Sequence, residues 1–368
     1  MIAVPMLDLA EQHRPLHDDL RCAFDRVISS NRFILGDEVG AFERAVAAFS
    51  GVSHGVGVSS GTDALLAMLM ACGVGPGDEV VTTPYSFIAT VEAIVRLGAK
   101  AVFADIDPVT LNLDPALAAE RVGPRTKAVL IVHLFGRPAR LGELGAVLRP
   151  LGIPLLEDAA QAIGAEGVAE QGQGAALSFF PSKNLGGFGD GGMVLTNDGD
   201  FAAQIRMLRN HGAAAKQNHD RIGGNFRLDE LQAALLAVKL PRLRSWTVAR
   251  RRVAAAYRAC LAALPVELPP DSEGSVWNQF VVRVAADCRP ALIEHLANKG
   301  IASAVYYPVP LHLQPALKSF GYRPGMFPQA ERAARETLAL PIYPDLADVV
   351  VAQISEAIAE FFSRRQAR

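Results

Sequence analysis

Short apolar runs that alternate with helical stretches constrain the fold of this chain more than any other feature. From residue 55 onward the chain passes repeatedly from a β-rich run into a segment whose apolar residues have helical spacing. Strands separated by helices pair in parallel and are covered on both faces, so the pattern predicts a largely parallel sheet between helical layers. The expected strands are GVGVSS (55–60), EVVTTP (79–84), KAVFADI (100–106), KAVLIVHL (127–134), IPLLED (153–158), ALSFFP (176–181) and GMVLTN (192–197).

Helical segments precede this region, and a second α/β region follows it. The long helical stretch 228–261, with a break expected near Pro241, would bridge a large domain of residues 1–245 and a smaller one of residues 246–368. In the smaller domain, WNQFVVRV (277–284) predicts a strand and 290–299 a helix. Further helices are expected at 16–29, 39–49, 62–71 and 86–97.

Composition excludes several classes of protein. The 36 basic and 38 acidic residues nearly cancel, which leaves no charge footprint for nucleic acid or an anionic membrane. The longest apolar stretch, 64–74, is too short to span a bilayer, and MIAVPMLDLAEQHRP lacks the pattern of a signal peptide. The cysteines are dispersed without zinc-site spacing, so we expect no metal and a cytoplasmic protein with reduced thiols at Cys22, Cys72, Cys260 and Cys288.

Ligands of such sheets bind at the carboxyl ends of the strands, and the first candidate there is the turn 59–63, Ser-Ser-Gly-Thr-Asp. A turn between a strand and a helix presents backbone N–H groups and the positive end of the helix dipole, which suits a phosphate. The alternative is an ordinary helix N-cap.

The second candidate is a carboxylate at the end of a later strand. Asp158 closes the apolar run IPLLED, where a buried charge is costly unless it is paired. One interpretation is a carboxylate that faces a protonated pyridine nitrogen and keeps a cofactor ring cationic. The alternative is again a helix N-cap.

The third candidate is Lys183, which follows the apolar strand 176–181 and precedes the glycine-rich run 185–192. Most lysines are solvated, but desolvation of this one would lower its pKa, as Schiff-base chemistry requires. A Walker-type phosphate loop is excluded because the lysine precedes the glycines. Phe87, after another strand, would stack on a planar ring or simply pack in the core.

These segments together resemble the DegT/DnrJ/EryC1/StrS family of nucleotide-sugar aminotransferases. The similarity extends over nearly the whole chain and is strongest around the lysine. It includes ILGDEVGAFE, SSGTDALLA, YSFIATVEAI, LLEDAAQAIGA, SFFPSKNLGGFGDGGMV, GGNFRLDELQAALL and YYPVPLHLQP. The resemblance implies the α/β fold of fold type I pyridoxal phosphate (PLP) transferases, with a mostly parallel, mixed sheet and a smaller C-terminal α/β domain.

The resemblance also implies the roles of individual residues. Lys183 would hold PLP covalently and shuttle the proton, with pyridoxamine phosphate as the intermediate form of the cofactor. Asp158 would pair with the pyridine nitrogen, and Gln161 would bind the ring-hydroxyl side. Phe87 would stack on the ring. The phosphate would be held by Gly61, Thr62, Asp63 and Ser178, and by Asn225 of the partner subunit.

A phosphate contact from a second subunit implies a homodimer with shared active sites. Arg227 has the planar guanidinium that suits a glutamate carboxylate, although a surface arginine at a helix start is the alternative. Tyr306 occupies a position where some family members carry histidine. His133, Tyr307 and His312 are candidate pocket residues, and each is equally compatible with a hydrogen-bonded structural role.

The implied reaction transfers the amino group of L-glutamate to a keto sugar and releases 2-oxoglutarate. Residues 225–229 and the loop 216–219 are similar to members that act at C-3, so a 3-keto UDP- or dTDP-hexose is favoured. Its amino-sugar product would enter cell-surface polysaccharide, lipopolysaccharide (including O-antigen) or secondary-metabolite synthesis. Alternatives are a C-4 keto sugar and a cyclitol. A sugar dehydratase of this fold carries histidine in place of the lysine, and a non-catalytic binding protein would not be expected to keep the intact site set.

Overall fold

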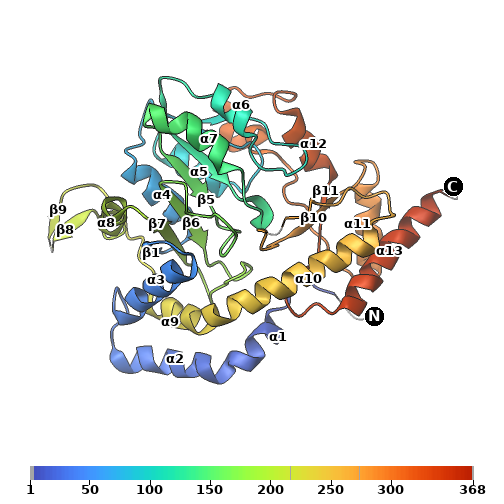
Figure 1. Ribbon diagram of the computed structural model, residues 1–368, viewed down its shortest axis with the longest axis horizontal. Helices are drawn as coiled ribbons and strands as arrows, with labels where there is room; N and C mark the ends of the chain where they lie inside the picture. Colours follow the sequence, from blue (N-terminus) through green and yellow to red (C-terminus); the bar gives the residue numbers. More distant parts are fainter. Residues whose placement is uncertain (1–3, 216, 273, 367–368) are drawn as a thin grey trace.

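The computed structural model describes residues 4–215, 217–272 and 274–366 of the chain. Its centre is a seven-stranded sheet with helices on both sides (Figure 1), in the order β1-β7-β6-β5-β4-β2-β3. All seven predicted strands are confirmed. They are β1 (His54–Val58), β2 (Glu79–Thr82), β3 (Lys100–Phe103), β4 (Thr126–Val132), β5 (Leu155–Asp158), β6 (Gly174–Ser178) and β7 (Gly192–Thr196).

The sheet is mostly parallel, as predicted, and β7 is the strand that makes it mixed. Strands β3, β2, β4, β5 and β6 pair in parallel, whereas β7 is antiparallel to both β6 and β1. No helix separates β6 from β7, so the chain returns directly alongside the strand it has just left. A Cβ on Gly192 would lie 2.4 Å from the backbone of Ser60, so glycine is required where β7 begins.

Alternate residues of the strands face two different helical layers. In β4, Ala128, Leu130 and Val132 join one apolar cluster, while Val129 and Ile131 join another. The first layer contains α4 (Gly61–Ala71), α5 (Ala89–Arg96) and α8 (Gly199–Leu208). The other contains α3 (Asp37–Phe49), α6 (Pro115–Glu120), α7 (Leu141–Leu148) and α9 (Glu230–Lys239).

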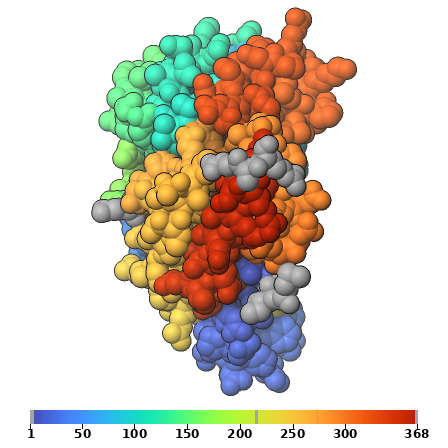
Figure 2. Space-filling model, turned by 90° about the vertical axis from the view of Figure 1, so that its right-hand side faces the viewer, coloured from blue at the N-terminus to red at the C-terminus, as the bar shows by residue number. Residues whose placement is uncertain are grey.

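The second domain has its own apolar core. Strands β10 (Phe280–Arg283) and β11 (Thr337–Leu340) pair antiparallel. Helix α13 (Asp348–Gln366) packs against α10 (Leu243–Leu261) and α11 (Arg289–Asn298), and Figure 2 shows it running across this face of the molecule. The predicted strand and helix correspond to β10 and α11, while the proposed 245/246 boundary stays a prediction, since α10 runs through it.

The remaining elements cover edges or connect the larger ones. The expected break at Pro241 is confirmed as a 3-10 turn between α9 and α10. No described helix is both long and apolar enough to cross a membrane. The connecting elements are α1 (Leu9–His13), η1 (Arg14–Leu16), α2 (His17–Ser30), η2 (Leu134–Gly136), η3 (Arg149–Leu151), β8 (Ala213–Ala215), β9 (Asn218–His219), η4 (Leu240–Arg242), η5 (Leu311–Leu313), η6 (Pro315–Phe320) and α12 (Pro328–Glu336).

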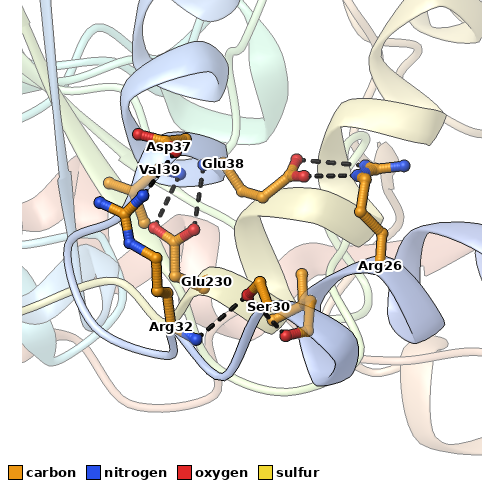
Figure 3. Close-up of polar contacts among 8 residues, drawn as sticks. Arg26, Ser30, Arg32, Asp37, Glu38, Val39 and Glu230 are labelled. Carbon is orange, nitrogen blue, oxygen red and sulfur yellow. Dashed lines mark hydrogen bonds and ion pairs between the residues drawn. The ribbon is translucent and has the colours of Figure 1, made fainter.

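A buried carboxylate fixes the start of α3 against the start of α9. Glu230, the first residue of α9, accepts hydrogen bonds from the backbone N–H groups of Gly36 (2.6 Å), Glu38 (3.0 Å) and Val39 (3.0 Å). These donors have no partner within a helix, so the carboxylate serves as the cap of α3. Figure 3 shows the same Glu38 in a two-bond ion pair with the exposed Arg26.

We predict that Glu230→Gln lowers the free energy of unfolding by about 1–3 kcal/mol, because the amide turns a donor toward buried N–H groups. Arg26→Gln is the matched control, since it breaks an exposed ion pair worth less than about 1 kcal/mol. Urea unfolding of the two variants measures both values. Equal losses would contradict the capping role of Glu230.

Candidate active site

The predicted site residues converge at the carboxyl ends of the central strands. Strand β5, in the middle of the sheet, ends at Asp158, and its parallel neighbour β6 ends at Ser178. The turn after β1 lies beside Ser178, because a Cβ on Gly61 would be only 2.8 Å from the Cβ of Ser178. Residues distant in sequence therefore line one edge of the sheet, as the strand-end rule predicts.

Asp158 is buried and embedded in hydrogen bonds. Its Oδ2 accepts from Thr90 Oγ1 (2.7 Å), which is in turn hydrogen-bonded to Ser86 Oγ (2.9 Å), and its Oδ1 accepts from Ala160 N (3.2 Å). Burial raises the pKa of Asp158, and these two bonds and the charge of Lys183 oppose that effect. The side chain thus bonds its local turn, but no described helix begins between β5 and β6, so the N-cap alternative is wrong for Asp158. The carboxylate remains one that a buried cation would stabilise.

Lys183 lies just beyond β6, with its backbone N–H donating to Phe180 O at 2.8 Å. Burial lowers the pKa of its amine, and the negative charge of Asp158 partly offsets that shift. A lysine with a lowered pKa has more of the free base that a nucleophilic amine needs. The structure therefore brings together the two residues that the sequence selected for their chemistry.

The turn after β1 has the geometry of a capped helix N-terminus. Ser60 Oγ accepts from Asp63 N (3.0 Å), which confirms the N-cap alternative for this turn. Asp63 Oδ2 accepts from Ser59 Oγ (2.6 Å), so its carboxylate orders the turn. Thr62 is half-buried in the first turn of α4, beside Gly61 and Ser178. An anion at this helix end would meet N–H groups and two hydroxyl side chains.

One wall of the site comes from the second half of the chain. Gln161 Oε1 accepts from Phe135 N (2.6 Å), and its Nε2 donates to Tyr307 Oη (3.2 Å). The ring of Tyr307 lies 6.3 Å from that of Phe87, whose side chain is 57% exposed and available for stacking. Phe87 is therefore not packed in the core, and Tyr307 lies beside both Gln161 and Phe87.

Two residues that the sequence did not single out hold this wall in place. Tyr85 Oη donates to Tyr306 O (2.6 Å) and accepts from Tyr307 N (3.0 Å), and burial raises its pKa to about 12. Thr90 orients the carboxylate of Asp158. Both occur in the YSFIAT segment that contains Phe87. Their polar groups, in a mostly apolar stretch at the start of a helix, could have identified them from the sequence.

The histidines predicted as pocket residues have structural partners. His133 is 1% exposed, and its Nδ1 accepts from Ala139 N (2.9 Å) while its Nε2 lies 2.8 Å from Glu157 Oε2. His312 is 2% exposed and pairs with Glu331 Oε1 at 3.2 Å. Burial lowers the pKa of His312. These partners are the ones that the structural alternative predicts, with both ring nitrogens of His133 and one of His312 engaged.

The segment 225–227 lies beside the turn after β1. Phe226 O accepts from Ser59 N (2.9 Å), and Arg227 Nη1 donates to Asn210 Oδ1 (2.9 Å). The Nε of Arg227 is buried without a partner among the described residues, and Asn225 is exposed. Of the loop 216–219, Lys216 lies outside the described residues. The described part of the chain contains no group of His, Cys, Asp and Glu residues arranged to hold a metal.

Comparison with known proteins points to one family. The model of the DegT/DnrJ/EryC1/StrS aminotransferase family matches residues 16–359. A pleiotropic regulatory protein of Geobacillus stearothermophilus is 47% identical, over 98% of each chain. A UDP-N-acetyl-3-dehydro-alpha-D-glucosamine 3-aminotransferase of Acidithiobacillus ferrooxidans is 42% identical, over 97% of each. The crystal structure of S. venezuelae DesV in complex with a ketimine intermediate is 40% identical, covers 98% of this chain and 99% of its own, and superposes with a TM-score of 0.94.

We predict that Lys183 of the cofactor-free protein reacts with acetic anhydride at a midpoint pH below 10.5, the ordinary lysine value. In Asp158→Asn the midpoint should fall further, because the carboxylate that favours the ammonium form is lost. Peptide mapping across a pH series, with a lysine peptide as the internal standard, gives both midpoints. Identical midpoints in the two proteins would show that Asp158 does not act on Lys183.

Proposed function

The chain belongs to the DegT/DnrJ/EryC1/StrS aminotransferase family, and we propose that it transfers the amino group of L-glutamate to a nucleotide-linked keto-hexose. It is a PLP-dependent aminotransferase of fold type I. The observation that carries the proposal is Lys183, a partly buried amine with a lowered pKa that lies within Coulombic range of the buried carboxylate of Asp158. A dehydratase would need histidine at 183.

The proposed acceptor is a 3-keto sugar carried by UDP or dTDP. Its support is the Acidithiobacillus relative, which is named for 3-amination of a UDP-linked 3-dehydro sugar. The alternatives are a 4-keto sugar and a cyclitol. The amino sugar would enter cell-surface polysaccharide, lipopolysaccharide such as O-antigen, or secondary-metabolite synthesis. We place the reaction in the cytoplasm, in keeping with four free cysteines.

The chemistry of the residues at the ends of β1, β5 and β6 fits PLP. Gly61 packs so closely on Ser178 that no larger residue fits between the two, and this leaves a cradle of N–H and hydroxyl groups at the start of α4. Thr62, Ser178 and the turn ordered by Asp63 would hold the phosphate. Asp158 would pair with the ring nitrogen, Gln161 and Tyr307 would border the ring hydroxyl, and Phe87 would cover one ring face.

When bound, PLP supplies an electron-withdrawing ring that stabilises negative charge on the amino-acid Cα. Lys183 Nζ, as the free base, takes the proton from that Cα and later returns one to the sugar carbon. Asp158 holds the proton on the ring nitrogen, because a buried carboxylate favours a cation beside it. Arg227 is the proposed anchor of the glutamate carboxylate, and Tyr306 is a proposed neighbour of the sugar.

We also propose that two copies of the chain share their active sites. Asn225 is exposed and so is free to reach the phosphate of the other subunit. Apolar side chains near the first helices are also exposed, among them Phe24 (45%), Phe33 (42%) and Ile34 (51%). Such exposed apolar groups gathered on one part of a surface are typical of an interface.

We predict that Lys183→Ala and Asn225→Ala homodimers are each strongly impaired, and that mixed dimers regain activity. In a mixed dimer one site has both defects and the other has neither, because Lys183 and Asn225 of one site come from different subunits. Refolding differently tagged variants together and purifying the doubly tagged species tests this with a glutamate-dependent assay. Mixed dimers no more active than the Asn225→Ala homodimer would refute shared sites.

We predict that the enzyme prefers 3-keto over 4-keto nucleotide sugars by at least tenfold in kcat/KM, which corresponds to about 1.4 kcal/mol of transition-state binding. The assay follows 2-oxoglutarate formation with matched UDP- and dTDP-linked substrates, and NMR locates the new amine. Preference for a 4-keto sugar would overturn the regiochemistry. Preference for a cyclitol would overturn the sugar-nucleotide proposal and leave the aminotransferase assignment intact.

A further inference from the structure

The segment that follows Lys183 turns back sharply before β7. Its backbone is closed by hydrogen bonds from Lys183 N to Phe180 O (2.8 Å) and from Gly187 N to Phe179 O (2.7 Å). A Cβ on Gly186 would lie 2.1 Å from Pro181 O, so only glycine allows this turn. The position of Lys183 therefore depends on how residues 184–189, here called the return loop, are held.

Helix α9 holds the return loop with a buried lysine. Lys239, the last residue of α9, is 1% exposed, and its Nζ donates to Gly186 O. The same Nζ lies 2.9 Å from Nε2 of His13 and 5.2 Å from the centre of the Phe188 ring. The ring of His13 is 4.8 Å from that of Phe188. One ammonium group thus joins the return loop to α1 and α9.

A second α9 side chain holds the loop two residues further on. Gln232 Oε1 accepts from Phe188 N at 2.9 Å, and a Cβ on Gly187 would lie 2.9 Å from the same oxygen. On the side nearer Lys183, Asn184 Nδ2 donates to Val276 O (2.9 Å), and its Oδ1 accepts from Asn278 (3.0 Å). The backbone after Lys183 is therefore held at 184, 186 and 188.

Burying the amine of Lys239 costs desolvation energy, and the need to fill space does not explain why a lysine stands here. Burial lowers its pKa to about 8, and no described carboxylate forms an ion pair with it. Burial and the charge of Lys239 lower the pKa of His13 to about 4, so at neutral pH the His13 ring is uncharged and its Nε2 accepts. An apolar side chain would fill this space without a desolvation penalty. What only a long donor provides is the bond to the Gly186 carbonyl.

We propose that Lys239 is a positioning residue for Lys183, and that its bond to the carbonyl of Gly186 keeps the return loop closed so that the Lys183 amine meets its reaction partner. The inference rests on the proposed role of Lys183 as the PLP-binding amine. Lys239 acts through the backbone and touches no substrate. Small displacements of a reacting group cost large factors in rate, so a loosened loop should slow chemistry more than it weakens binding.

The test compares four variants with the wild type. Lys239→Met removes the donor and keeps the volume, and Lys239→Arg keeps a donor of similar reach. Gln232→Met removes a different hydrogen bond to the same loop at a half-buried position. It replaces Lys239→Met in the test if that variant fails to fold. Tyr257→Phe is the matched control, because it deletes a different buried bond to a backbone carbonyl, from Tyr257 Oη to Pro341 O (2.9 Å), in the second domain.

Two measurements separate positioning from general stability. Hydrogen exchange of the amides of residues 184–189 in the cofactor-free protein reports loop closure without any activity. Single-turnover kinetics with glutamate report the reactivity of the loaded enzyme. We expect Lys239→Met to speed exchange in the return loop and to slow the single turnover by about 10–100-fold with a nearly unchanged glutamate Kd. Lys239→Arg should recover most of this loss, and Gln232→Met should shift both readouts in the same direction by less.

Lys239→Met with wild-type exchange in the return loop would overturn the proposal, whatever its stability. The proposal also fails if Tyr257→Phe slows turnover equally, since the effect would then be general destabilisation. Borohydride reduction of the PLP-loaded wild type followed by peptide mapping checks the premise separately. If PLP does not become attached to Lys183, the proposed function is wrong, and the exchange measurement still decides whether Lys239 closes the loop.

Discussion

The buried carboxylate of Asp158 is the constraint on which the rest of the site depends. An anion in this position is tolerated only with compensating partners, and the protein supplies the hydroxyl of Thr90, the N–H of Ala160 and the charge of Lys183. The same burial lowers the pKa of Lys183. Desolvation thus raises the pKa of Asp158 and lowers that of Lys183. A cationic ring beside Asp158 would stabilise its buried charge and leave Lys183 as a free base.

Local pattern was sufficient to predict which strand ends carry the candidate site residues. Each parallel strand is an apolar run, and Asp158 and Ser178 are the polar residues that end β5 and β6. Because parallel strands share one carboxyl edge, their order along the chain already implied that these side chains meet. The antiparallel direction of β7 follows from its connection, because no described helix separates it from β6, and not from the strand itself, since five residues have the same spacing in either direction.

What the pattern did not predict are partners that are distant in sequence. His133 follows an apolar strand and Asp158 ends one, yet only the structure shows that the ring nitrogens of His133 meet Glu157 and the backbone of Ala139. Tyr307 meets Gln161 across 146 positions of the chain, and Tyr85 bonds Tyr306 across 221. The packing of the second domain on the sheet decides which residue lies opposite each of these polar side chains. The local spacing of apolar residues carries no information about such partners.

The direction of β7 also determines how the reactive lysine must be supported. A parallel strand after β6 would have needed a crossover helix, and a helix would have carried the chain rigidly away from Lys183. The antiparallel return leaves a glycine-rich turn whose backbone carbonyls and N–H groups lack sheet partners. Those groups need donors and acceptors from outside, and α9 provides them with Lys239 and Gln232 while its first residue, Glu230, caps α3. One helix therefore contacts both the N-terminal layer and the loop that follows Lys183.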